Sequence, residues 1–256
     1  MIIFFFLDCG DLKLAVHISL LSEKQLNLPT LASSAVPTSM KLVKTFNFNS
    51  EPYSVTTHGD VIFAGLSNGK ILQCSDKATG QSVFVDTGSL VSGLYVYNDE
   101  LYVLLEQASK VNVYHLTTRQ LLRSWKHDSS GRDINKLRVL NNKVIIPNRR
   151  LPSLTVYSLQ GELIKQITIP FMSTGLKALA VCGDNSVILS DFGANNVSRI
   201  NIDSGEVVWT SNHVQNPKGV VCYRNSYVMV TSRNTDTRIW ILDIYTGNLW
   251  SVFSNC

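Results

Sequence analysis

One short pattern recurs along this chain at a spacing of about 42 residues. In each copy a pair of residues, mostly Asn, Asp or Gly, lies between two short apolar runs, as in Leu94–Val103. The pairs are Gly59-Asp60, Asn98-Asp99, Asn141-Asn142, Asp184-Asn185 and Arg224-Asn225. Self-similarity at a fixed period of this length is typical of repeat architectures, so the chain is expected to build one unit several times.

Each repeat divides into four short strands, a to d, which is the composition of a β-propeller blade. Strands a and b are almost continuously apolar, as expected for strands covered on both faces, whereas strand d alternates and suits a half-exposed outer position. The fourth repeat shows the set most clearly, with strands predicted at Ala178–Val181, Val187–Leu189, Val197–Asn201 and Val207–Thr210. The predicted fold is therefore all-β, a propeller of four-stranded antiparallel blades.

The number of blades is set by the ends of the chain. Five blades are clear, and a sixth is expected to be partial or missing. Lys41–Phe48 resembles an extra d strand before the first blade, and Ile2–Leu7 and Leu12–Ile18 could add two strands to the same sheet. The propeller is predicted over residues 40–256. Residues 1–39 are taken as an N-terminal extension of unassigned structure, with disorder left open.

Composition limits the class of protein. Apolar residues make up 45% and charged residues 16%, as in folded proteins, and the net charge of +4 alone implies no polyanion partner. The five cysteines form no C-x-x-C pair, which favours reduced, buried thiols. The apolar start, Ile2–Phe6, is shorter than a signal or membrane segment. We therefore expect a cytoplasmic protein without membrane contact.

Two family resemblances are visible in the fourth repeat. The segment Lys177–Thr210 resembles the repeat of NHL and YVTN-type β-propellers, and Pro217–Val221 is similar to the entry of such a repeat. This resemblance implies a six-bladed type of scaffold for protein or RNA contacts. Asp203–Trp209 resembles the tryptophan-bearing motif of quinone-binding propellers, with a looser copy at Thr246–Trp250. The alternative is that these tryptophans only pack the outer strands.

An enzymatic role finds little support in the residues. The five histidines have no metal-ligand spacing, and nucleophile, P-loop and dinucleotide motifs are absent from the sequence. Some propellers are metal-dependent hydrolases of the lactonase type. Such an enzyme would need oxygen ligands for the metal at the central channel of the ring. Glu51, Asn135 and Asp191 are the only candidates. We predict no catalytic residues, no metal and no cofactor.

Basic residues gather in the middle of the chain. Lys126, His127 and Arg132 fall in the d-to-a loop after the second blade, while Arg149 and Arg150 fall in the b-to-c loop of the third. These two loop classes share one rim of a propeller, so the five side chains are predicted to form a binding patch. Arginine pairs well with carboxylate or phosphate. The predicted function is non-enzymatic recognition of a protein partner by this loop-lined rim, with RNA as the alternative partner.

Overall fold

The computed structural model describes eleven stretches of the chain. They are residues 2–7, 13–19, 23–24, 36–37, 44–75, 80–127, 136–148, 151–169, 173, 176–232 and 238–254. These residues form β-strands and turns, and the part of the chain described contains no helix.

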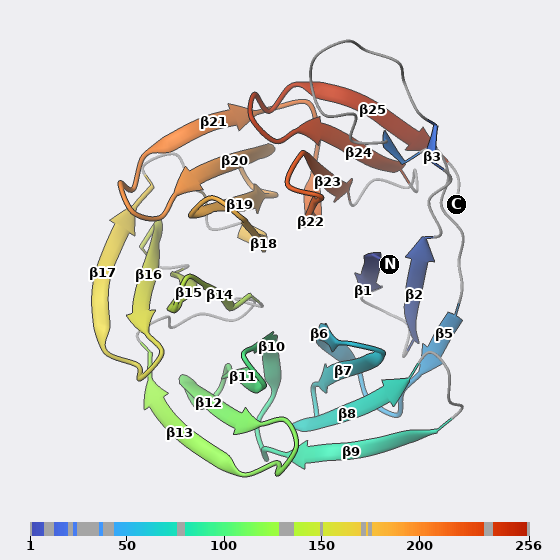
Figure 1. Cartoon of the computed structure of the whole chain (residues 1–256), viewed down its shortest axis with the longest axis vertical. Coiled ribbons are helices and arrows are strands. Elements are labelled where there is room, and N and C mark those ends of the chain that lie inside the picture. The colour runs from blue at the N-terminus through green and yellow to red at the C-terminus, as the bar shows by residue number, and fades with distance from the viewer. Residues whose placement is uncertain are drawn as a thin grey trace.

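Five consecutive four-stranded antiparallel sheets are the blades of the predicted propeller, arranged around a centre (Figure 1). Blade 1 contains β6 (Pro52–His58), β7 (Val61–Leu66), β8 (Lys70–Ser75) and β9 (Gln81–Asp86). Blade 2 contains β10 (Val91–Tyr97), β11 (Glu100–Leu105), β12 (Lys110–His115) and β13 (Leu121–Lys126). Blade 3 contains β14 (Arg138–Leu140), β15 (Lys143–Asn148), β16 (Ser153–Ser158) and β17 (Leu163–Thr168). Blade 4 contains β18 (Leu176–Cys182), β19 (Ser186–Asp191), β20 (Asn196–Asn201) and β21 (Val207–Ser211). Blade 5 contains β22 (Pro217–Tyr223), β23 (Tyr227–Ser232), β24 (Arg238–Asp243) and β25 (Leu249–Ser254).

A sixth, three-stranded sheet lies between blade 5 and blade 1 (Figure 1). It contains β1 (Ile2–Leu7), β2 (Lys13–Ser19) and β5 (Lys44–Asn47), and β1 contacts the inner strands β6 and β22. Because β5 leads into β6 through a short loop, like the loop from β9 to β10, it takes the place of an outer strand, as predicted. The sixth blade is thus partial. β1 and β2 precede the predicted domain start at Met40, whose exact position stays a prediction.

A short two-stranded sheet is not paired with the strands of the blades. It consists of β3 (Glu23–Lys24) and β4 (Val36–Pro37), which pair with each other in antiparallel fashion.

Repeated turn chemistry sets the strand pairing inside each blade. Asn98 and Asp99 in blade 2, and Asn141 and Asn142 in blade 3, all have positive φ. Two such residues in succession give a hairpin turn whose twist matches that of the strands it joins. The recurring pair read from the sequence is therefore the turn between strands a and b.

The hydrophobic core is divided into slabs between neighbouring blades. One slab joins Ile145 and Val156 of blade 3 to Leu179 and Leu189 of blade 4, all of them at most 2% exposed. Phe46 extends this arrangement to the sixth sheet, because it packs against buried residues of blade 1. Each blade is covered on both faces, which explains why strands a and b are so continuously apolar.

Candidate functional site

Two opposite faces of the ring carry the connections between strands. The turns from a to b and from c to d lie at one end of each blade, which we call the turn face. Within a blade they are tied together: the backbone N–H of Leu116 donates to the carbonyl of Asp99 at 3.0 Å, and that of Ile202 to Asn185 at 2.8 Å. The b-to-c and d-to-a loops lie at the other end, the loop face.

Polar side chains link neighbouring blades around the turn face. The hydroxyl of Tyr97 in blade 2 donates to Asn142 Oδ1 of blade 3 at 2.8 Å. Lys143 of blade 3 pairs with Asp203 of blade 4 at 2.5 Å, and its hydrogen bond lowers the pKa of that carboxyl. The a–b turns predicted from the sequence therefore contribute to contacts between blades as well as within them.

A second set of contacts joins two outer strands, β13 and β17, to the next blade. Arg123 Nε of β13 donates to the carbonyl of Leu159 in blade 3 at 2.7 Å. Lys165 Nζ of β17 donates to the carbonyl of Asp203 in blade 4, also at 2.7 Å. In both cases the acceptor lies in the c–d turn of the following blade. Hydrogen bonds from a side chain to the backbone therefore join blade 2 to blade 3 and blade 3 to blade 4.

Arg123 also has a carboxylate partner within its own blade. Its Nη1 and Nη2 donate to the two carboxylate oxygens of Glu100 at 2.8 and 2.5 Å, and Nη2 lies 2.8 Å from the hydroxyl of Tyr102. The hydrogen bond from Arg123 lowers the pKa of Glu100, whereas burial raises the pKa of Tyr102. Glu100 is therefore an anion at neutral pH, and the group is an interblade clamp rather than an acid–base pair.

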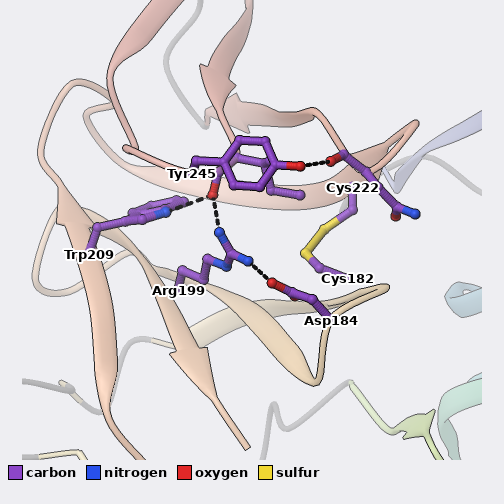
Figure 2. Close-up of a disulfide and its surroundings, with 8 residues drawn as sticks. Cys182, Asp184, Arg199, Trp209, Cys222 and Tyr245 are labelled. Atoms are coloured by element: carbon purple, nitrogen blue, oxygen red, sulfur yellow. Dashed lines mark hydrogen bonds and ion pairs between the residues drawn. A yellow bond between two sulfur atoms is a disulfide. The ribbon is translucent and has the colours of Figure 1, made fainter. Parts of the chain in front are cut away.

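Several side-chain contacts meet at the junction of blades 4 and 5 (Figure 2). Trp209 Nε1 and Arg199 Nη1 both donate to the carbonyl of Ile244, at 2.8 and 2.7 Å. Arg199 is only 5% exposed, and it also pairs with Asp184 and lies 5.7 Å from the ring centre of Tyr245. A buried guanidinium with these partners fixes the angle between the two blades.

Glycine is required where Trp209 meets the c–d turn of blade 5. Gly247 has φ +72°, and a Cβ on it would lie 2.6 Å from Trp209 Cε3. Gly161 meets Trp125 of blade 2 in a comparable way. Trp125 and Trp209, on the outer strands of blades 2 and 4, are thus packing residues between blades.

A disulfide crosses the same junction and corrects the prediction of reduced thiols. Cys182 at the end of β18 is bonded to Cys222 of β22, with 5.9 Å between their Cα atoms and a sequence separation of 40 (Figure 2). The separation is about one repeat, so the two residues occupy matching positions on adjacent inner strands. Cys74 is a buried cysteine, as expected. Cys9 and Cys256 lie outside the described residues.

The predicted basic patch is only partly within the described residues. Lys126 is exposed as the last residue of β13 on the loop face, whereas His127 is buried at 6% exposure and therefore does not offer its ring to a partner. Arg132, Arg149 and Arg150 lie outside the described residues. Whether the patch assembles stays a prediction.

One candidate ligand for a hydrolase, Asp191, has a structural role. Asp191 is buried, and its carboxylate accepts hydrogen bonds from the backbone of Ser173 at 2.5 Å and of Gly193 and Ala194 at 3.0 Å. It therefore shapes the b–c loop of blade 4. Asn135 lies outside the described residues. Among the described residues there is no group of three or more His, Cys, Asp or Glu side chains placed to hold a metal ion.

The outer strands expose large apolar side chains that sequence reasoning did not single out. Most of them form pairs at the start of an outer strand: Leu121 and Leu122 in β13, Leu163 and Ile164 in β17, Val207 and Val208 in β21, Leu249 and Trp250 in β25. The alternation in strand d suggested half exposure but not this recurrence. The described part of the chain has no helix that could cross a membrane.

These features define a β-propeller with interlocked blades. The chain matches, over residues 31–251, the model of the PQQ_2 family, described as outer membrane protein assembly factor BamB, and it belongs to that family. The prediction of a propeller repeat protein is confirmed, while its assignment to the NHL or YVTN type is not supported. No curated protein matches the chain.

Solved structures with low sequence identity share the fold. A chain from the nidogen/laminin complex has a TM-score of 0.70 at 13% identity, covering 98% of this chain and 92% of that one. BamB from Moraxella catarrhalis has a TM-score of 0.54 at 14% identity, covering 93% and 79%. The WD40 propeller domain of Doa1 has a TM-score of 0.63 at 11% identity, covering 81% and 69%.

Proposed function

We propose that this protein is a non-enzymatic scaffold that recognises a protein partner at the surface of its ring. The observation that carries the proposal is the family match, because it spans most of the chain and the family is described as an assembly factor. Propellers host many functions, so the fold alone would not support it. The clamps between blades, such as Arg123 on Leu159, add a rigid frame on which loops and outer strands are held in place.

Three exposed positions sample the surfaces through which a partner could bind. Lys126 lies on the loop face, Thr117 lies in a c–d turn on the turn face, and Leu163 lies on an outer strand. Each would be replaced in turn by the photocrosslinking residue benzoylphenylalanine in cells that express the full chain. We expect a protein adduct from one surface and not from the other two.

The same experiment can overturn the proposal. Adducts of equal yield at all three positions, or at none, would mean that no surface is specialised for a partner. If the adduct comes from Lys126, the variant Lys126→Glu should weaken binding of the purified partner, as a patch that pairs with carboxylates requires. The comparisons give no support to RNA as the partner.

The compartment is tested separately. The sequence predicts the cytoplasm, whereas disulfides persist mainly in oxidising compartments. Cells lysed in acid with a thiol-alkylating reagent would preserve the state of Cys182 and Cys222. Alkylation of both residues supports a cytoplasmic location, and their recovery as a linked peptide contradicts it.

A further inference from the structure

The outer strands of the blades are open sheet edges. β9, β13, β17, β21 and β25 each end their four-stranded sheet, and within the described residues each has a strand neighbour on one side only. Such an edge presents a row of backbone N–H and C=O groups that can pair with another strand, and proteins commonly protect it with charged residues. Three of the five strands carry such charges: Asp86 in β9, Lys126 in β13 and Lys165 in β17.

β25 is the least protected of these edges. Leu249–Ser254 contains no charged residue, and Leu249, Trp250 and Val252 are 42, 48 and 38% exposed. β21 is also uncharged, but it is one residue shorter and buries Trp209 against blade 5. A six-residue edge that is both uncharged and apolar is a site for strand pairing.

The exposed side chain of Trp250 is supported by a buried aromatic ring. Its ring meets the ring of Tyr227 edge to face, with 5.6 Å between centroids and 64° between planes. Tyr227 is 5% exposed, so it is a fixed support for a side chain that is itself half exposed. Aromatic residues in fixed positions are enriched among those that dominate binding energy at interfaces.

The size of the surface at β25 indicates whether its partner is a peptide segment or a second copy of the chain. β25 lies on the outer circumference of the ring (Figure 1), so two rigid propellers could meet there only along one strand of about 20 Å. Stable dimers bury roughly 1,600 Å² in total, which needs more than a single strand. A separate extended segment fits the edge, because its backbone can pair with the strand beyond the register shift at Trp250 while its side chains contact Trp250 and Val252.

We propose that β25 is a strand-addition site that binds an uncharged, extended segment of a partner protein as a fifth strand of blade 5. This inference rests on the proposed scaffold function and names the surface and the chemistry of the partner. Main-chain hydrogen bonds supply most of the recognition, so the segment needs alternating small polar and apolar side chains rather than one fixed sequence.

The probe is a capped heptapeptide of alternating Thr and Val with a fluorescent label, titrated into the full-length protein by fluorescence anisotropy. The wild type should bind it, and amide hydrogen exchange in residues 249–254 should slow on binding. Trp250→Lys should weaken binding about tenfold or more, because it removes an anchor and adds a charge to the edge. Val252→Lys provides a second variant should Trp250→Lys lower the melting temperature.

Val208→Lys is the matched control. Val208 is 49% exposed and, like Trp250, is the extra residue at a register shift between the two outer strands of its blade. It should change binding less than twofold. A peptide N-methylated at every residue, which has no backbone N–H left to donate along either edge, should not bind.

Several outcomes would overturn the proposal. These are no binding up to 1 mM peptide, equal weakening by Val208→Lys and Trp250→Lys, or unchanged binding of the methylated peptide. A wild-type dimer that Trp250→Lys dissolves would show that a second copy is the occupant instead. A crosslinked partner whose affinity is unchanged by Trp250→Lys would leave the scaffold function intact while removing this site.

Discussion

Removing the Cys182–Cys222 disulfide should cost more stability than most single contacts in this protein. The bond closes a loop with a sequence separation of 40 and lies between the inner strands of blades 4 and 5. The loop entropy removed from the unfolded chain is worth about 4 kcal/mol at 25 °C. Cys182 is nearly inaccessible, so replacement by Ser adds a smaller cost for burying a hydroxyl.

The assay is urea unfolding of the wild type and of the double variant Cys182→Ser, Cys222→Ser, each with and without dithiothreitol. Reductant should lower the free energy of unfolding of the wild type by roughly the loop term and leave the double variant unchanged. Cys74→Ser is the control, because it removes a buried thiol without touching the crosslink and should keep the response to reductant.

Two results would refute this reasoning. A wild type whose unfolding is insensitive to reductant, although mass spectrometry shows the bond reduced, would mean that the blade junction already restricts the chain. A response to reductant that persists in the double variant would mean that another cysteine pair is responsible.

Three other perturbations test the clamps and the turns. Trp209→Phe removes the hydrogen bond to Ile244 but keeps most of the ring packing, so urea unfolding should show a loss of about 1 kcal/mol. The folded-state pKa of Glu100 is lowered by Arg123, so their contribution is present above the unfolded pKa of about 4.3 and is lost as pH falls through the folded value. The difference in stability between wild type and Arg123→Met should accordingly shrink in thermal melts at low pH; a difference independent of pH would show that only packing was lost. Asn98 has φ +47°, so Asn98→Ala should lower stability by about 1 kcal/mol while Asn98→Gly changes it little, and equal losses would show that the side chain rather than the backbone matters.

Much of the fold could be predicted from local sequence because each blade repeats the same local chemistry. The pairs at Asn98 and Asn141 mark hairpin turns, and the apolar runs around them mark strands buried on both faces. The outer strand Lys44–Asn47 was also predictable. Its sequence resembles strand d of the repeats, and a strand of this kind before the first blade must pair with strands of a further sheet. These patterns extend over only a few residues, so they can be recognised in the sequence without knowledge of the tertiary structure.

The tertiary structure alone decided which distant side chains meet. Cys182 and Cys222 sit one repeat apart, a signal visible in the sequence, yet only the packing of adjacent inner strands brings their Cα atoms to 5.9 Å. In the sequence, Arg199 is an ordinary polar residue of a predicted strand. It is buried because the turn of blade 5 that contains Ile244 covers it. His127 was expected on a rim and is buried instead. Burial and pairing depend on the neighbouring blade, about one repeat away in sequence, which local patterns cannot specify.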